Sequence, residues 1–393
     1  MKNKSIRGEK MTGINNETPQ EETGTTRRSV LKHGAIGAAG VIGGSSLLAA
    51  CGSDSGTTST SSSAGPPTNV SGTINALCWE GYTDPAWTKS FTKETGVTVK
   101  STFIGSNDEL VAKLRGAPNQ YDLVSPSSDT TNILIDAGQV RTINLNQVPN
   151  AKTTIPFFQT APAVNVDGKL YGVPVAWGFI PLIFDADKVK PAPTSWEDLW
   201  DPKFKNQLSV WQDIALIYTT AIQLGYKNVY TLDDTQLEAI KTKLIAQKPN
   251  IRKYWTTAGE LANLFMNNEV IAGMSFGGVT ITQLQGEGRN VKEIIPTEGA
   301  TSWFDNWMIP TKAPNPDAAL SYINYFHKAQ TQKQFAAITG YGITNENAFN
   351  LVTPEYSKAY ELNNPDFITS LDYWKAVPRR QKYLDVLNAV VAA

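Results

Sequence analysis

The residues best suited to binding a charged group lie close together in residues 302–310. An extended chain points successive side chains to opposite faces, so Trp303, Asp305 and Trp307 would share one side. A buried carboxylate there needs a partner, because an unpaired buried charge is very costly. A ligand cation would be such a partner, and each indole face would add about 0.5–2 kcal/mol of cation–π attraction. A second interpretation stays open, in which Asp305 bonds nearby backbone and the tryptophans fill the core.

The first fifty of the 393 residues have the order of an export leader rather than of a fold. Arg27 and Arg28 precede a Gly/Ala-rich apolar run, as in signal peptides. The paired arginines resemble a twin-arginine signal, and the Leu-Ala-Ala-Cys sequence that ends at Cys51 resembles the lipobox of bacterial lipoproteins. We therefore expect residues 1–50 to be cleaved off and Cys51 to carry the lipid that anchors the protein to the membrane.

The segment that follows the leader is a linker. Residues 51–72 are rich in Gly, Ser, Thr and Pro and cannot bury a core. The folded part therefore starts near Thr73 and has about 320 residues, more than one hydrophobic core usually covers, which predicts two lobes. Nothing after the leader has the apolar length of a membrane span. We place the N-terminal lobe at residues 73–176 plus 303–350 and the C-terminal lobe at residues 177–302 plus 351–393.

Charge and reactive side chains exclude several function classes. Subtracting the seven basic and four acidic leader residues from totals of 35 and 36 leaves 28 basic and 32 acidic residues. No basic stripe marks a nucleic-acid surface. Cys78 is the only cysteine besides Cys51, so neither a disulfide framework nor a cysteine metal site is expected. A single histidine after the leader, His327, argues against histidine-based catalysis. We expect no cofactor, no metal, no catalytic residue and a monomer.

The elements that would position the site alternate between strand and helix. In order, the patterns are a strand at 74–79, a helix at 82–95, a strand at 97–103, a helix capped at Ser106 and a strand at 121–125. This order predicts a parallel sheet between layers of helices, with ligands beyond the carboxyl ends of the strands. Residues 79–82 and 127–129 lie at such ends. Later patterns predict strands at 170–178, 208–211 and 270–276, a second sheet beginning at 179–184, and helices at 194–200, 213–224, 260–267, 316–339 and 379–391.

From residue 74 to the C-terminus the chain resembles the spermidine/putrescine-type polyamine-binding proteins of ABC transporters, within the periplasmic binding protein superfamily. The motifs that carry the resemblance lie at residues 91–97, 121–127, 172–178, 194–200, 224–226, 303–310 and 339–341. The resemblance implies an α/β fold of two lobes, each a mainly parallel sheet flanked by helices, with a ligand cleft between them. It also implies a permease as partner and no enzymatic activity.

The resemblance implies a set of ligand contacts, with some departures. Matching positions are Trp79, Tyr82, Ser127, Phe276, Trp303, Asp305 and Tyr341. Asp213 supplies one of two acids that the family places three residues apart, and the second is absent. Asp129 stands where polyamine binders have a tyrosine, and Glu80 also departs from the family pattern. Lys375 follows Trp374 where the family has Trp-Gln, so a cation would approach the pocket.

These departures leave the solute open. The lost acid and the added lysine weaken the case for a long polyamine and suit a smaller or zwitterionic amine, such as an opine-like solute. A metal receptor would need clustered oxygen ligands, usually adjacent tyrosines, which the sequence lacks. A surface glycosidase would pair Asp305 with Asp129 or Glu80. We interpret the chain as a lipid-anchored protein of the periplasm or cell surface that delivers a cationic, polyamine-like solute to an ABC importer.

Overall fold

The computed structural model describes residues 65–393. The predicted signal peptide, Cys51 and most of the predicted linker lie outside these residues. The described residues all belong to one compact unit. None of the helices in its described part has the length and apolar character that a membrane crossing requires.

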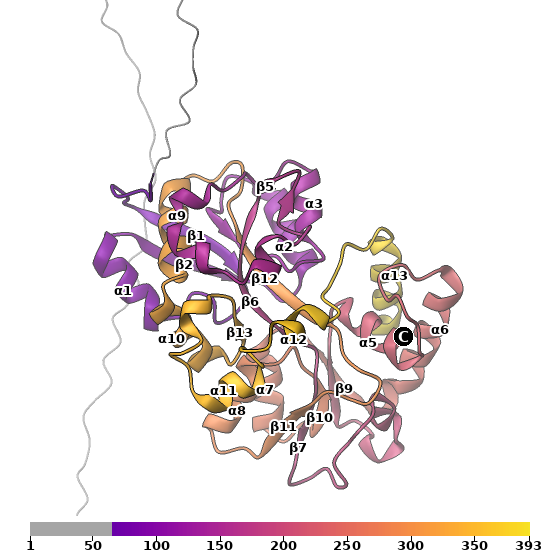
Figure 1. The fold of residues 1–393 in the computed structure, drawn as a ribbon. Helices are drawn as coiled ribbons and strands as arrows, with labels where there is room; N and C mark the ends of the chain where they lie inside the picture. Colours follow the sequence, from indigo (N-terminus) through magenta and orange to yellow (C-terminus); the bar gives the residue numbers. More distant parts are fainter. Residues whose placement is uncertain (1–64) are drawn as a thin grey trace, which may run out of the picture. The chain divides into compact units, whose positions relative to one another are not determined.

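Two mixed sheets organise this unit (Figure 1). The first has the order β13-β6-β12-β3-β1-β2. Its strands are β1 (Thr73–Cys78), β2 (Thr98–Phe103), β3 (Leu123–Val124), β6 (Gly172–Phe179), β12 (Ser302–Met308) and β13 (Gly342–Ile343). The second has the order β11-β7-β10-β8-β9. Its strands are β7 (Leu182–Asp185), β8 (Leu208–Trp211), β9 (Ile251–Trp255), β10 (Ala272–Met274) and β11 (Val291–Ile294). A small hairpin pairs β4 (Asn165–Val166) with β5 (Lys169–Leu170).

The prediction of mainly parallel sheets holds for strand direction but not for every neighbouring pair. In the first sheet β1 pairs in parallel with β2 and β3, whereas β12 runs antiparallel to both β3 and β6. In the second sheet β8 pairs in parallel with β9 and β10, whereas β7 runs antiparallel to β10 and β11. Strand β13 is also antiparallel to β6. Two reversed strands in the first sheet, β12 and β13, and one in the second, β7, therefore leave most strands pointing the same way while making the pairing mixed.

Helices cover the two sheets. They are α1 (Pro85–Thr95), α2 (Asn107–Gly116), α3 (Thr131–Asp136), α4 (Pro156–Gln159), α5 (Ala215–Gln223), α6 (Asp234–Gln247), α7 (Ala258–Met266), α8 (Val279–Gly286), α9 (Pro316–Phe326), α10 (Ala329–Thr339), α11 (Pro354–Ala359), α12 (Pro365–Ser370) and α13 (Arg380–Ala392). Short 3₁₀ helices occur at Leu145–Gln147, Pro149–Thr153, Trp196–Trp200, Pro202–Phe204, Lys248–Asn250 and Glu346–Ala348. The C-terminal helix α13 packs on α5 and α6, helices of the second sheet (Figure 1).

Local signals in the sequence explain where several helices begin and end. The Ser106 side chain accepts a hydrogen bond from the amide of Glu109 and caps α2, as predicted. Helix α1 starts three residues later than predicted because Asp84 caps it and Pro85 occupies its first position. It ends at Gly96, whose φ of +76° is a left-handed conformation that glycine adopts without strain. The predicted helix at 194–200 is a single 3₁₀ segment with a capping box at Ser195.

Candidate functional site

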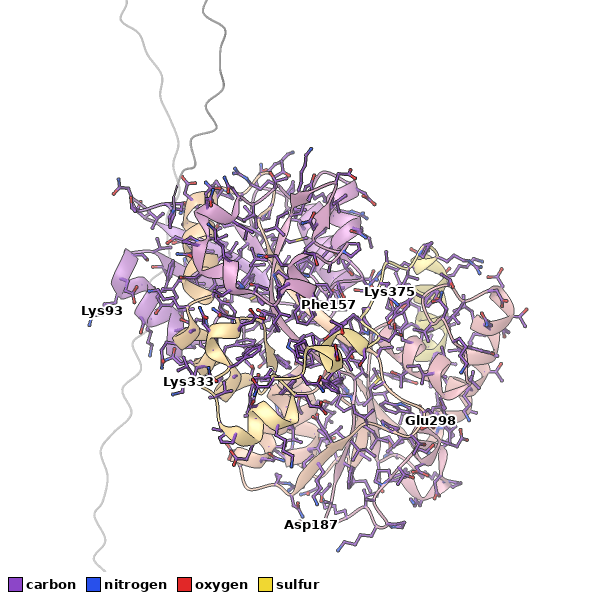
Figure 2. All side chains as sticks on the ribbon, viewed as in Figure 1. Lys93, Phe157, Asp187, Glu298, Lys333 and Lys375 are labelled. Atoms are coloured by element: carbon purple, nitrogen blue, oxygen red, sulfur yellow. The ribbon has the colours of Figure 1, made fainter. Side chains whose placement is uncertain are left out.

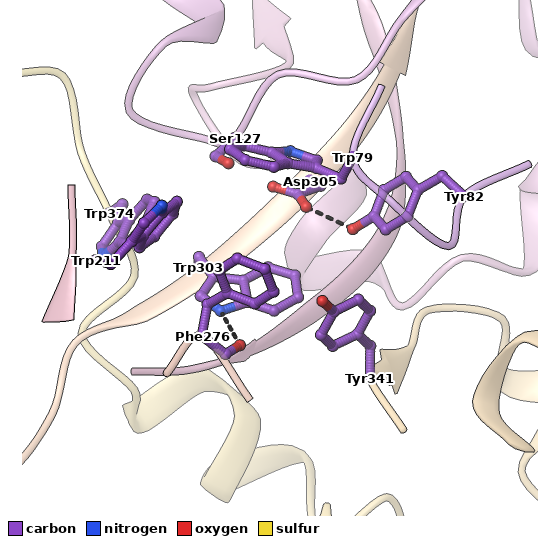
Figure 3. Close-up of a pocket in the computed structure, with 9 residues that line it drawn as sticks. All are labelled: Trp79, Tyr82, Ser127, Trp211, Phe276, Trp303, Asp305, Tyr341 and Trp374. Atoms are coloured by element: carbon purple, nitrogen blue, oxygen red, sulfur yellow. Dashed lines mark hydrogen bonds between the residues drawn. The ribbon is translucent and has the colours of Figure 1, made fainter. Parts of the chain in front are cut away.

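A pocket lined by nine residues lies where the two sheets meet (Figure 3). Seven of the nine are aromatic, and the other two are a serine and an aspartate. The lining consists of Trp79, Tyr82, Ser127, Trp211, Phe276, Trp303, Asp305, Tyr341 and Trp374. The walls enclose about 280 Å³ of space not filled by atoms, the opening to solvent included. The pocket is therefore an aromatic box with one acidic group.

Strand β12 positions Asp305 at the centre of the first sheet. Asp305 lies opposite Ala176 of β6, and the register shifts before the next pair, Asn306 and Pro174. Pro174 has no amide hydrogen to donate to a ladder, so a bulge at this point is the arrangement that a central strand tolerates. On its other side Asp305 bridges to Ser127, in the chain that follows β3. Backbone on both sides therefore fixes the position of the carboxylate.

Glycine makes room for the indole beside this aspartate. Trp303 lies opposite Gly178 of β6, and a Cβ on Gly178 would stand 2.6 Å from the indole carbon Cζ2. The Trp303 Nε1 group donates to the carbonyl oxygens of Phe179 and Phe276, each at 3.2 Å. The Tyr341 ring meets Trp303 edge-on, with centroids 5.0 Å apart. Of the three residues predicted to share one face, Trp303 and Asp305 line the pocket, whereas Trp307 packs against Tyr82, Tyr322 and Phe326 in the core.

The Asp305 carboxylate is buried and only partly satisfied. Its Oδ2 atom accepts a hydrogen bond from the Tyr82 hydroxyl at 2.5 Å, while Oδ1 has no partner among the described residues. Burial raises the pKa of Asp305 to about 7, the nearby Ser127 and Tyr82 hydroxyls lower it, and the charge of Asp129 raises it. Burial also keeps Tyr82 protonated by raising its pKa well above 10. The free oxygen is thus an acceptor available to a ligand.

The second sheet supplies the opposite wall. Trp211, at the carboxyl end of β8, packs with its ring centroid 6.2 Å from that of Trp374 and 5.0 Å from that of Phe276. Its Nε1 group donates to the backbone oxygen of Gly105, which follows β2 of the first sheet. Trp374 donates its Nε1 hydrogen to the Thr301 hydroxyl. Trp211 also stacks on Trp255, with centroids 5.4 Å apart, so its ring faces pack against the indoles of Trp255 and Trp374.

Seven of the eleven predicted ligand residues come together in this pocket, and four do not. Those in the lining are Trp79, Tyr82, Ser127, Phe276, Trp303, Asp305 and Tyr341. Those outside it are Glu80, Asp129, Asp213 and Lys375. Each of the four contacts other parts of the fold instead of lining the pocket.

Asp129 is occupied by a cation from the C-terminal helix. Arg380 of α13 reaches Asp129 Oδ2 at 2.9 Å and also pairs with Asp108 of α2 at 2.8 Å. The Tyr218 hydroxyl donates to the same Asp129 oxygen at 3.1 Å. Asp129 is 1 % exposed, so this pairing offsets its desolvation. The carboxylate therefore joins the two halves of the unit instead of binding solute.

The other three charged residues have local roles. The Glu80 carboxylate accepts from the amide of Gly259, in the first turn of α7. Asp213 Oδ1 accepts from the amide of Ala215 at the start of α5, because the chain turns after β8 ends. Lys375 is mostly exposed and pairs with Asp372 (Figure 2), since neighbouring side chains of an extended segment face opposite ways and Trp374 takes the inward position.

Trp211 and Trp374 are the lining residues that the prediction missed. A tryptophan that ends a parallel strand is a recognisable signal, because ligands gather beyond such strand ends, and Trp211 ends β8. Trp374 lies in an irregular segment between α12 and α13, and no local pattern assigns it to the pocket. Among residues 65–393 no group of three His, Cys, Asp or Glu side chains is placed to hold a metal.

Comparisons with known proteins identify the family and the fold of the chain. The family model of bacterial extracellular solute-binding proteins matches residues 86–364. The spermidine/putrescine-binding periplasmic protein of Salmonella typhimurium is 32 % identical over 281 residues, covering 70 % of this chain and 79 % of that protein. A solved structure from Listeria monocytogenes has the same fold, with a TM-score of 0.74 at 24 % identity over 81 % of this chain and 98 % of that one. The spermidine/putrescine ABC transporter substrate-binding protein of Streptococcus pneumoniae has a TM-score of 0.65 at 25 % identity, over the same shares.

Proposed function

The chain belongs to the bacterial extracellular solute-binding protein family, and from this premise we propose that it binds a cationic amine and delivers it to an ABC importer. Its relatives are transport proteins, several of them named for spermidine or putrescine, and we propose no catalytic activity. The observation that carries the amine is the Asp305 carboxylate, whose free oxygen lies in an aromatic box. An ammonium group would gain a charged hydrogen bond there and cation–π attraction from the surrounding rings.

A thermal-shift screen of the purified protein tests this proposal. A solute that binds only the native state adds about 2.7 kcal/mol of apparent stability at a hundredfold excess over its Kd. The panel contains mono-, di- and polyamines, amino acids and opine-like solutes. We expect amines to raise the melting temperature and neutral alcohols of the same length to leave it unchanged. A panel in which only acidic or neutral solutes stabilise the protein would overturn the amine assignment.

Affinity for the amine found in the screen is expected to rise with pH up to about 7. The pKa of Asp305 is raised by burial to about 7, so the carboxyl group is largely protonated below that pH. A cation pairs only with the ionised form, and the affinity should fall by up to about tenfold per pH unit below 7. Calorimetric titrations at several pH values measure this. The Asp305→Asn protein should show no such slope, and a flat profile in the wild type would contradict the assignment.

The proposal includes anchoring at the membrane. We propose that residues 1–50 direct export by the twin-arginine route, that Cys51 is lipidated and that residues 52–72 tether the binding unit. Such a tether suits a receptor that must stay near its permease and still reach it. We also propose a monomer whose lobes comprise residues 73–176 with 303–350 and residues 177–302 with 351–393.

Replacing Cys51 with serine is expected to abolish lipidation and leave the fold unchanged, because we propose its thiol as the acylation site and Cys51 precedes the described residues 65–393. Metabolic labelling with a fatty-acid analogue and cell fractionation measure the result. Cys78 is buried, so Cys78→Ala serves as the matched control and should keep the label. Label retained in Cys51→Ser would show that the leader is wrongly interpreted.

A further inference from the structure

The charge of the pocket limits what it can bind. Among its nine lining residues Asp305 is the only carboxylate, and there is no lysine, arginine or histidine. The hydroxyls of Ser127, Tyr82 and Tyr341 are neutral. One cation therefore neutralises the pocket, and a second would leave it with a net positive charge.

The nearby acids lie outside the pocket lining, so a second cation would not contact them directly. Asp129 is paired with Arg380, Glu80 accepts from Gly259, and Asp213 caps the start of α5. None of the three carboxylates lines the pocket. A second ammonium would lose its hydration and meet only aromatic faces and hydroxyls. The desolvation penalty of an ion exceeds the attraction of a single aromatic face, so the second charge would weaken binding.

A second lining atom without a hydrogen-bond partner, Trp79 Nε1, also bears on which solute fits. Within the described residues, the lining has two buried polar side-chain atoms without a hydrogen-bond partner, Asp305 Oδ1 and Trp79 Nε1. The first accepts and the second donates. An indole N–H cannot pair with an ammonium group, because both are donors, but it can pair with a hydroxyl, ether or carbonyl oxygen. Trp79 is 7 % exposed, so an acceptor on the solute would satisfy an otherwise buried donor.

We propose that the pocket selects solutes with a single cationic group whose remainder is uncharged and carries an oxygen acceptor, in preference to diamines and polyamines. This inference rests on the proposed function, since it states how many positive charges the amine bound by Asp305 carries. Amino alcohols and amino amides of a few carbon atoms belong to this class.

Calorimetric titration of the full chain with a matched pair of solutes tests the inference. 4-Aminobutan-1-ol and 1,4-diaminobutane have the same length and differ only in a hydroxyl that replaces one ammonium group. The amino alcohol is expected to bind at least tenfold more tightly. Equal or tighter binding of the diamine would overturn the inference while leaving the proposed function intact. If neither these solutes nor butylamine binds, the proposed function itself fails and the inference fails with it.

A variant separates the donor from the charge. Trp79→Phe keeps an aromatic face and removes the N–H, and it should weaken binding of the amino alcohol at least fivefold more than it weakens binding of butylamine, which has no oxygen. Equal losses for the two solutes would show that Trp79 contributes only its ring surface, and would overturn the assignment of an oxygen acceptor.

Discussion

Replacing Asp305 with asparagine is expected to weaken binding of the cationic solute by about 2–5 kcal/mol, which is roughly thirtyfold to several thousandfold in Kd. Asparagine keeps the shape and volume of the side chain and removes its charge. The ammonium group would then enter a pocket lined by aromatic rings and neutral hydroxyls. Titration calorimetry with the amine from the screen measures the loss. A Kd within threefold of the wild-type value would show that Asp305 is not the anchor.

Asp213→Asn is the matched control for this experiment. Asp213 is also a buried carboxylate, and burial raises its pKa to about 7, as for Asp305. Its Oδ2 atom likewise has no partner among the described residues, but it does not line the pocket. Asp213→Asn should leave the Kd within about threefold of the wild-type value. A large loss in this variant would restore Asp213 to the binding site.

The two substitutions should also leave the ligand-free protein no less stable at neutral pH. A carboxyl group whose pKa rises on folding stabilises the native state while it is protonated, and that contribution is lost as the pH rises through about 7. At pH 8 the wild-type protein therefore holds a buried carboxylate at a cost that asparagine does not have. Urea denaturation without ligand at pH 5 and pH 8 measures the difference, and a marked loss of stability in Asp305→Asn would indicate a structural role instead.

Replacing Arg380 with methionine is expected to lower the free energy of unfolding by about 3–5 kcal/mol. Removing one partner of a buried ion pair strands the other, and such losses are large. Asp129 would lose its cation while 1 % exposed, and Asp108 would lose a second contact with the same side chain. Urea denaturation followed by circular dichroism measures the change.

The neighbouring arginine supplies the control. Arg379 pairs with Asp234 at the surface, where ion pairs contribute at most about 1 kcal/mol, so Arg379→Met should cost little. Adding Asp129→Asn to Arg380→Met should recover part of the lost stability, because the stranded charge is removed. If Arg380→Met costs no more than Arg379→Met, the buried pair does not stabilise the fold.

How far the sequence predicts the site depends on whether a residue acts alone or through a distant partner. Trp79 could be assigned because its position at a strand end follows from the β-α-β order, and Trp303 because alternation along an extended strand places it on the side of Asp305; both line the pocket. Four of the five charged residues assigned to the site, all but Asp305, lie outside the lining, since a carboxylate is open to a solute only if nothing in the fold pairs with it first. Asp129 meets Arg380 across 251 positions of the sequence, and no local pattern reveals that pairing.

The fold was predictable to a similar degree. Strands and capped helices matched their patterns, because hydrophobic periodicity and side-chain caps act over a few residues. The sequence did not show that β7 and β12 run opposite to their neighbours, because strand direction depends on the path of the long connections between the sheets. Helix α6 was not predicted, because polar residues between its apolar ones weaken the helical periodicity. Asp233 and Gln236 nevertheless form a capping box at its start.

Some contacts link segments of the first sheet directly to segments of the second, with no ligand between them. These contacts have a thermodynamic consequence for binding. Arg380 with Asp108 and Asp129, and Trp211 with Gly105, favour this conformation before a solute arrives. The apparent Kd of a solute equals its intrinsic Kd divided by the fraction of molecules in the binding-competent state. Lowering that fraction from nearly all to one tenth would raise the apparent Kd about tenfold with every pocket residue unchanged. Affinity in this protein can therefore be tuned from helix α13, outside the pocket altogether.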